Sequence, residues 1–344
     1  MRVLVTGHRG YLGTILFSVL KHARCDVVGL DCDWYKGCDF GRVHQHTPGL
    51  DMDVREVDCG DLVGLDAVVH LAALPERACS DFPPRLVDEV NVEATIRLAE
   101  LCKQASVSRF VFASTCAVYG RGEYGLLDEN GPLDPATTFA QSKLRCEREL
   151  TRRADRRFCP VILRNPTLYG VSPRLRTDTV VNDLVAAAVS TGKIAMQSSG
   201  GAWRPLAHAE DVAHAYAALL AAPDRLVHRQ TFNVVRSDEN YRVIDIADAI
   251  TELVPQSARS ITPNVFDQRS YRVDGSKLQR LFPSLRFKWT LPFGIRQLRS
   301  AMLVGGLTPG DWRSDRYRRS LRLKTLLERK ALGSDLRARQ ATPI

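Results

Sequence analysis

Short apolar runs alternate with longer amphipathic stretches through the first 165 residues, and this alternation limits the possible folds more than any other feature of the chain. Each run is nearly continuous in apolar residues, which is typical of strands buried on both faces. The runs are RVLVTG (2–7), CDVVGLD (25–31), AVVHLAA (67–73), RFVFAS (109–114) and CPVILR (159–164). Helix-like segments lie between them, at 11–23, 86–105 and 139–154. Strands that alternate with helices predict β-α-β units and a doubly wound parallel sheet of the α/β class.

The composition is that of a globular protein with a large core. The chain has 344 residues, of which 44% are apolar, and no apolar run reaches the ~18–20 residues that a membrane span needs. MRVLVTG enters a strand directly, without the pattern of a signal peptide. The nine cysteines are scattered and include no C-x-x-C pair. We therefore expect reduced thiols in a cytoplasmic protein, with no membrane partner, no disulfide frame and no zinc site.

The formal net charge is +9, and the basic residues are densest at 313–330. Such a run is compatible with nucleic-acid binding, but no aromatic-interleaved basic module accompanies it. We expect instead a solvated, partly amphipathic helix and no nucleic-acid partner. Its apolar side is formed by Leu321, Leu323, Leu326 and Leu327.

VTGHRGYLG joins the first predicted strand to the first predicted helix and places glycines at positions 7, 10 and 13. Glycines permit a tight turn there and let backbone amides approach a pyrophosphate at the helix N-terminus. The pattern alone is weak, because a plain strand-turn-helix has the same glycines. The strand before it, the helix after it and Asp31 at the end of the second strand favour dinucleotide binding.

Two residues bear on the choice between NAD and NADP. The Asp31 carboxylate can accept hydrogen bonds from the ribose hydroxyls and repels a 2′-phosphate. Arg9 lies in the glycine turn, where a guanidinium can pair with that phosphate. We expect NAD, with NADP as the alternative.

The order of these motifs resembles the extended short-chain dehydrogenase/reductase family, and more narrowly its sugar-nucleotide epimerase/dehydratase branch, from residue 1 to about 290. The matching segments are the glycine turn, VDCGDL (57–62), HLAAL (70–74), EVNVEAT (89–95), ASTCAVYG (113–120), TFAQSK (138–143), LRNPTLYG (163–170), WRPLAHAEDVA (203–213) and QRSYRVDGSK (268–277). The resemblance implies a Rossmann domain, here 1–165, and a smaller substrate domain, here 166–344, of which some segments return to the first.

The resemblance also assigns site residues. The implied cofactor contacts are Gly7, Arg9, Gly10, Tyr11, Leu12, Gly13, Asp31, Asp58, Cys59, Leu71, Ala72, Ala73, Asn91, Lys143 and Pro166. The implied contacts of a nucleotide-sugar substrate are Thr167, Asn182, Arg204 and Arg269. Thr115 falls where family members hold the sugar oxygen, and Lys143 where they hold the nicotinamide ribose. Family members commonly dimerise through a four-helix bundle, which implies a homodimer through 86–105 and 139–154.

TFAQSK departs from the family pattern. It matches the Y-x-x-x-K segment, whose tyrosine is the acid/base, but Phe139 stands at the tyrosine position. A phenyl ring neither donates nor accepts a proton, and the loss of a general acid typically lowers the rate by roughly 10²–10⁴-fold. The usual 4,6-dehydratase also needs an acidic pair after the threonine, where this chain has Cys116 and Ala117.

Three interpretations follow. In the first, the protein transfers hydride at a sugar ring carbon, as an epimerase or ketoreductase, and another group moves the proton: Cys116, Tyr119, or a water held by Thr115 and Lys143. In the second, it is a catalytically silent homologue that binds NAD and a sugar nucleotide. In the third, it performs a different elimination with tightly held NAD, as a non-standard dehydratase that uses Cys116. The His residues have no metal-ligand spacing, so no metal is expected.

Overall fold

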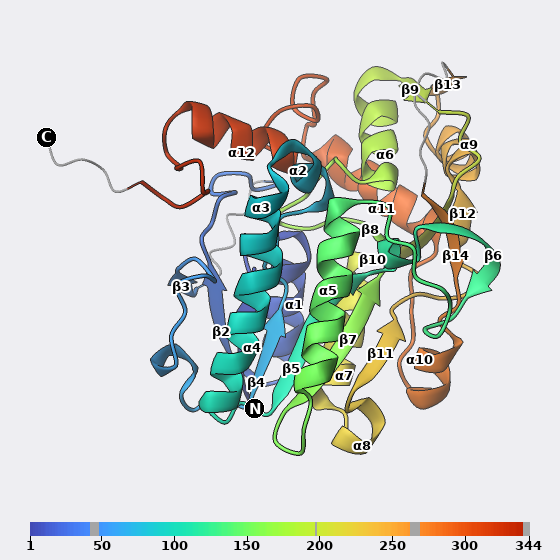
Figure 1. Ribbon diagram of the computed structural model, residues 1–344. Helices are drawn as coiled ribbons and strands as arrows, with labels where there is room; N and C mark the ends of the chain where they lie inside the picture. Colours follow the sequence, from blue (N-terminus) through green and yellow to red (C-terminus); the bar gives the residue numbers. More distant parts are fainter. Residues whose placement is uncertain (42–47, 197, 262–268, 340–344) are drawn as a thin grey trace, which may run out of the picture.

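The computed structural model describes residues 1–41, 48–196, 198–261 and 269–339. Seven parallel strands form its central sheet in the order β11-β7-β5-β4-β1-β2-β3 (Figure 1). They are β1 (Arg2–Thr6), β2 (Asp26–Asp31), β3 (Leu50–Asp51), β4 (Ala67–His70), β5 (Arg109–Thr115), β7 (Cys159–Asn165) and β11 (Gln230–Asn233). The five apolar runs all lie in this sheet, so the predicted doubly wound α/β fold is confirmed.

Helices cover both faces of the sheet (Figure 1). On one face lie α3 (Pro84–Val87), α4 (Ala94–Gln104) and α5 (Thr138–Arg153), and on the other α1 (Tyr11–His22) and α7 (Ala209–Ala221). Each layer encloses its own apolar core: Leu98, Cys102 and Leu150 belong to the first, and Leu16, Tyr216 and Leu219 to the second. The expected helix over 86–105 is interrupted by a π-helical segment, Asp88–Glu93.

The remaining elements lie beside the carboxyl ends of the strands or continue the main sheet's layers. The further strands are β6 (Arg121–Leu127), β8 (Thr167–Tyr169), β9 (Lys193–Met196), β10 (Trp203–His208), β12 (Asn240–Arg242), β13 (Ala258–Ile261) and β14 (Ser270–Val273), in the sheets β12-β10-β8, β13-β9 and β14-β6. The further helices are α2 (Glu76–Asp81), α6 (Val180–Thr191), α8 (Asp224–Val227), α9 (Val243–Leu253), α10 (Ser276–Leu281), α11 (Leu291–Val304) and α12 (Arg319–Glu328), with short 3₁₀ turns at Gly60–Leu62 and Cys116–Tyr119. β11 and α7, which follow residue 165, belong to the central sheet and its helical layer, so some segments of the second half return to the first. The division into domains at residue 165 stays a prediction.

The basic segment near the end of the chain is only partly as expected. Its helix, α12, begins at Arg319 and packs Leu323, Leu326 and Leu327 into an apolar cluster with α2. Lys324 Nζ lies 3.0 Å from Asp81 Oδ1 of α2, and the two helices lie side by side (Figure 1). Arg319 itself is only 3% exposed. The expected helix therefore differs at two positions of its first turn: Arg319 is buried by tertiary packing, and Leu321, expected on the apolar side, is 38% exposed.

Two possible features are absent from the described ranges. None of their helices is both long enough and apolar enough to cross a membrane. Their His, Cys, Asp and Glu side chains form no group of three or more that is arranged to hold a metal ion.

Candidate active site

One large cleft, of about 1460 Å³, lies at the carboxyl ends of the central strands, and we call it the central cleft. Gly7 after β1, Leu71 after β4, Thr115 at the end of β5 and Asn165 at the end of β7 all line it. This is the edge at which parallel α/β sheets bind their ligands. The volume exceeds that of an ordinary single-ligand pocket, so the cleft has room for two ligands.

The glycine turn forms one end of the central cleft. Gly7 has φ +72° and donates its N–H to Leu30 O at 2.8 Å, while Gly10 N–H bonds Gly7 O at 3.0 Å. A Cβ at Gly13 would lie 2.1 Å from Gly7 O, and one at Gly7 would lie 2.8 Å from Ala72 N. No side chain fits at these two positions. The turn therefore exposes the N-terminus of α1 to the cleft, which is the arrangement that binds a pyrophosphate.

Carboxylates dominate the end of β2. The Asp31 carboxylate accepts hydrogen bonds from the backbone N–H of Arg9 at 3.0 Å and of Asp33 at 2.8 Å. Burial raises the pKa of the Asp31 carboxyl group, although those two hydrogen bonds act to lower it. The Arg9 guanidinium contacts Asp51 and lies 3.6 Å from Asp33. Because Arg9 already faces carboxylates, a 2′-phosphate there would meet repulsion, and this favours NAD over NADP.

Lys143, on the first turns of α5, is the cation of the cleft floor. Lys143 is only 3% exposed, and burial lowers the pKa of its ammonium group. Nζ lies 4.7 Å from the centroid of the Phe112 ring and 5.8 Å from that of Phe139. Across residues 1–41, 48–196, 198–261 and 269–339, no hydrogen bond or ion pair of this ammonium group is found. A ligand oxygen would supply the acceptor that this buried cation lacks.

Thr115 and Phe139 also line the central cleft. The Thr115 hydroxyl oxygen accepts the N–H of Ala117 at 3.1 Å, which leaves its own proton for a ligand oxygen. Thr137 caps α5 by accepting the Ala140 N–H at 3.2 Å and so fixes the first turn that carries Phe139. The three residues expected around the nicotinamide and the sugar, Thr115, Phe139 and Lys143, are therefore brought together.

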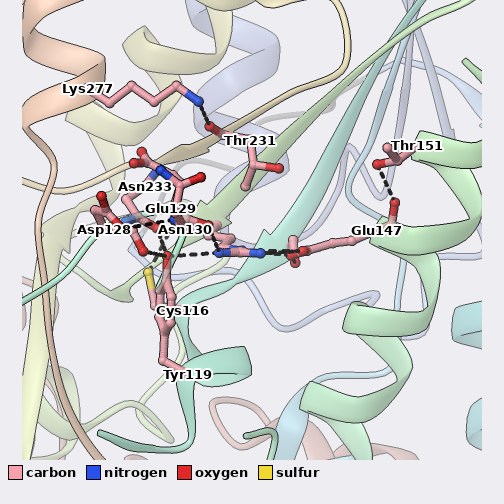
Figure 2. Close-up of polar contacts among 12 residues, drawn as sticks. Cys116, Tyr119, Asp128, Glu129, Asn130, Glu147, Thr151, Thr231, Asn233 and Lys277 are labelled. Atoms are coloured by element: carbon pink, nitrogen blue, oxygen red, sulfur yellow. Dashed lines mark hydrogen bonds and ion pairs between the residues drawn. The ribbon is translucent and has the colours of Figure 1, made fainter. Parts of the chain in front are cut away.

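Cys116 and Tyr119 lie elsewhere, in a buried polar network behind β5 (Figure 2). Cys116 is 0% exposed and donates its S–H to Arg164 O at 3.3 Å. Burial raises the pKa of its thiol far above the ordinary value. The Tyr119 hydroxyl lies 2.8 Å from Asn233 Oδ1 and accepts from Arg164 Nη1 at 2.9 Å. Neither residue lines the central cleft. This placement argues against both as proton carriers, and against a dehydratase reaction that uses Cys116.

Two expected ligand contacts are used by the protein itself. The Asn91 side chain accepts Leu74 N–H at 2.8 Å and donates to Ser142 Oγ at 3.3 Å, so it ties the loop after β4 to α5. Asn182 is 0% exposed; its amide bonds Gly170 N, Arg176 O and the Tyr11 hydroxyl. Both side chains therefore position neighbouring parts of the protein, and direct contact of Asn91 with the cofactor or of Asn182 with the substrate stays a prediction.

The other expected residues divide by whether they line the central cleft. Those that do are Gly7, Gly10, Tyr11, Leu12, Gly13, Leu71, Ala73, Pro166, Thr167, Arg204 and Arg269. Those that do not are Arg9, Asp31, Asp58, Cys59 and Ala72. Asp58 is exposed and caps the turn at Gly60–Leu62 through its bond with Gly60 N at 2.7 Å. An adenine contact for Asp58 and Cys59 stays a prediction.

The far end of the cleft holds groups that sequence reasoning missed. Arg204 Nη1 donates to Arg269 O at 2.5 Å, and Arg269 pairs with Glu76 at 2.5 Å. Glu76 also accepts from the Thr137 hydroxyl at 3.4 Å, two residues before Phe139. Tyr271, beside these groups on β14, lines the cleft as well, and burial raises the pKa of its phenol. Glu76 and Tyr271 belong to no recognised spacing, and only the fold brings them here.

The seven-stranded parallel sheet, the glycine turn and the cleft at its carboxyl edge define a Rossmann-type α/β protein. Residues 3–234 match the model of the "NAD dependent epimerase/dehydratase family", and the chain belongs to that family. The similar proteins include the "Uncharacterized UDP-glucose epimerase YtcB" of Bacillus subtilis (strain 168), 30% identical over 65% of this chain and 73% of that protein.

Solved structures agree with this assignment. "MoeE5 in complex with UDP-glucuronic acid and NAD" superposes with a TM-score of 0.75 at 27% identity, over 88% of this chain and 99% of that one. The UDP-glucose 4-epimerase of Thermus thermophilus, in complex with NAD, gives a TM-score of 0.72 at 25% identity, over 88% and 99%.

Proposed function

We propose that this protein binds NAD and a nucleotide-activated sugar together in the central cleft and transfers hydride at a sugar ring carbon, as an epimerase or a ketoreductase. The observation that carries the proposal is the continuity of the cleft. It runs from the glycine turn past Lys143 and Thr115 to the Arg204–Arg269 pair. MoeE5 was solved with UDP-glucuronic acid and NAD, and the Thermus thermophilus UDP-glucose 4-epimerase with NAD. Together with the name of the Bacillus subtilis relative, an uncharacterized UDP-glucose epimerase, they support the same substrate class here.

The residues of this chain fit the cofactor. The glycine turn offers backbone N–H groups to its pyrophosphate, Asp31 lies where the adenosine ribose belongs, and buried Lys143 offers an ammonium group to the nicotinamide ribose. Bound NAD supplies a hydride acceptor that can also return the hydride. The nine cysteines are all free thiols, which supports a cytoplasmic location.

The protein's part in the reaction is orientation and proton handling. Thr115 donates its hydroxyl proton to the sugar oxygen, because its lone pairs already face the Ala117 N–H. The Lys143 cation stabilises negative charge as it develops nearby. Phe139 contributes no proton, and the thiol of Cys116 lies outside the cleft. The routes that remain for the proton are a water held between Thr115 and Lys143, Glu76, or the phenol of Tyr271.

The experiment is turnover of UDP-glucose, UDP-galactose and UDP-glucuronic acid by purified protein with NAD, followed by NMR of the sugar. Interconversion, or reduced nicotinamide that accumulates with one sugar, supports the proposal. Glu76→Gln and Tyr271→Phe then identify the proton carrier by which of them abolishes turnover; if neither does, the water route stands. Binding of NAD and sugar without any chemistry would overturn the enzymatic proposal in favour of a silent binding protein.

The silent alternative is favoured by Phe139 itself. Phe139→Tyr separates the two functions. If activity appears only in this variant, the natural protein is silent in that chemistry. Phe293→Tyr is a matched control, because Phe293 is 58% exposed on α11 and lies outside the cleft.

We further propose a homodimer through the outer faces of α4 and α5. These helices lie side by side (Figure 1). The Arg153–Glu100 ion pair, at 2.8 Å, joins α5 to α4, and the Arg145–Asp88 ion pair, at 2.6 Å, joins α5 to the π-helical segment before α4. Light scattering after gel filtration tests the oligomeric state, and a monomer at micromolar concentration overturns this proposal.

A further inference from the structure

The segment from Trp312 to Arg319, directly before and into α12, forms a wall of the central cleft. Trp312, Arg313, Arg318 and Arg319 all line it. The segment is held by backbone contacts: Thr177 donates its hydroxyl to Trp312 O at 2.6 Å and its N–H to Tyr317 O at 3.0 Å. The family match ends at residue 234, so this wall lies outside the part of the chain that the family model describes.

The wall and two other residues that line the cleft, Tyr35 and Thr179, contain buried hydrogen-bond donors that have no acceptor within the described ranges. They are the Tyr35 hydroxyl, the Thr179 hydroxyl, Trp312 Nε1, Arg318 Nε and Arg319 Nη1, and all five residues line the central cleft. Buried donors are almost always paired in native proteins, because an unpaired one forfeits its bond with water. A ligand rich in acceptors is what this wall lacks.

Charge specifies the ligand further. Arg176 pairs with Asp178 at 2.5 Å, and Arg318 pairs with Asp183 at 2.6 Å. The Arg319 guanidinium donates to Arg174 O at 2.6 Å and lies 4.1 Å from the Tyr35 ring, and it forms no ion pair with any carboxylate in the described part of the chain. One buried guanidinium therefore lines the cleft without a counterion of its own. Arginine suits phosphate oxygens, which can take two parallel N–H bonds from it.

The place of Arg319 selects which phosphate. Tyr35 belongs to the loop after β2, whose Asp31 marks the ribose end of the dinucleotide site. On the other side, Asn182 Nδ2 donates to Arg176 O at 2.9 Å and to the hydroxyl of Tyr11 at 3.2 Å, and Tyr11 lies within the glycine turn, between Gly10 and Gly13. Arg319 and Tyr35 thus lie between the glycine turn and the ribose end, where a pyrophosphate belongs. Arg204 and Arg269, which contact each other, line another part of the cleft.

We propose that Arg319 and the hydroxyl of Tyr35 bind the pyrophosphate of the dinucleotide from the side opposite the glycine turn, so that the cofactor is clamped between segments about 300 residues apart. The inference rests on the proposed binding of NAD. It adds that the C-terminal wall retains the cofactor, and that the cofactor leaves only when this wall moves.

The test is calorimetric titration of NAD-free protein with ADP-ribose, AMP and UDP. ADP-ribose carries the pyrophosphate without nicotinamide, AMP carries no pyrophosphate, and UDP reports the sugar-nucleotide end. Tyr35→Phe is the principal variant, because its hydroxyl has no hydrogen bond to lose among the described residues and its removal leaves the fold intact. Arg319→Gln removes the positive charge, whereas Arg319→Lys keeps the charge but removes the parallel N–H donors of the guanidinium. Arg329→Gln is the control, since Arg329 is exposed at the C-terminal end of α12 and lies outside the cleft.

We expect Tyr35→Phe to weaken ADP-ribose binding several-fold and Arg319→Gln to weaken it about 10-fold or more, as for the loss of a charged hydrogen bond. AMP affinity should change less, and UDP affinity should stay as in Arg329→Gln. The inference is overturned if UDP binding falls while ADP-ribose binding holds, or if neither changes. If Arg319→Gln does not fold, Tyr35→Phe and Arg319→Lys decide alone. Failure of the unaltered protein to bind ADP-ribose or NAD would instead overturn the proposed function.

Discussion

Two regions of this protein are both rich in Arg, Tyr and carboxylates, yet they differ in one respect. In the network behind β5, Arg164 has both Glu147 and the Tyr119 hydroxyl as partners, and Tyr119 has Asn233 (Figure 2). In the C-terminal wall of the central cleft, Trp312 Nε1 and Arg319 Nη1 have no acceptor within the described ranges, and neither has the hydroxyl of Tyr35, whose ring lies 4.1 Å from the Arg319 guanidinium. The difference teaches that pairing, and not composition, separates a structural polar cluster from a ligand site. A complete network stabilises the fold, whereas an incomplete one indicates a missing ligand.

The largest effect that would sharpen this comparison is on stability. Glu147→Gln leaves the Arg164 guanidinium, in a residue only 4% exposed, without its carboxylate. Removing one partner of a buried ion pair costs about 3–5 kcal/mol, so we expect the free energy of unfolding in urea to fall by that amount. Glu149→Gln, on the exposed side of the same helix, is the control and should change little. Equal effects of the two variants would show that the network does not stabilise the fold.

The next effect is on turnover. Thr115→Ala removes the hydroxyl that both holds the sugar oxygen and accepts the Ala117 N–H. We expect kcat to fall by about 10²-fold, equivalent to about 3 kcal/mol, because a group of the cleft is lost at the transition state. Thr115→Ser keeps the hydroxyl and should retain most of the activity. A Thr115→Ala protein that turns over normally would remove Thr115 from the site.

Replacing Lys143 should have opposite effects on the stability of the protein and on its affinity for NAD. Burial lowers its pKa, so the folded protein penalises the charged form, which both states carry at neutral pH. Lys143→Met should therefore raise the free energy of unfolding by about 1 kcal/mol while weakening NAD binding. The contribution of Lys143 to stability should become less unfavourable as pH rises from its lowered pKa to its ordinary value, because only the unfolded chain still binds the proton there. Buried thiols such as Cys116 and Cys146 have raised pKa values and act in the opposite direction, so the contribution is measured as the difference between Lys143→Met and the unaltered protein, by denaturation of both at several pH values. A difference that does not change with pH would contradict the assignment.

The smallest effect is expected at Cys116. Cys116→Ser keeps a small donor next to Arg164 O and changes nothing that lines the central cleft. Turnover should equal that of the unaltered protein. A complete loss of turnover in a folded Cys116→Ser protein would break the comparison, since a paired group of the network would then act in the chemistry.

The sheet and the glycine turn were predictable because each depends on local sequence: buried strands are apolar runs, and a turn that leaves no room for Cβ needs glycine. The position of Cys116 outside the central cleft could have been predicted in part. Adjacent residues near the end of a strand face opposite sides, so a Thr115 that faces the cleft turns Cys116 away from it. Asn182 could not have been placed, because its partners, Gly170 and Tyr11, are brought to it only by the fold. The burial of Arg319 could not be predicted from the basic run, because it comes from Tyr35 and Arg174, far away in sequence.

The long separation between the glycine turn and the Trp312–Arg319 wall has a consequence during synthesis. Ribosomes deliver the N-terminal half first, and domains begin to fold as they emerge. The sheet and the turn can form while the wall is still untranslated, so the nascent cleft is open on one side. Capture of the cofactor would then be completed only after translation has passed Arg319, and a ribosome-stalled chain that ends before Trp312 should lose dinucleotide quickly.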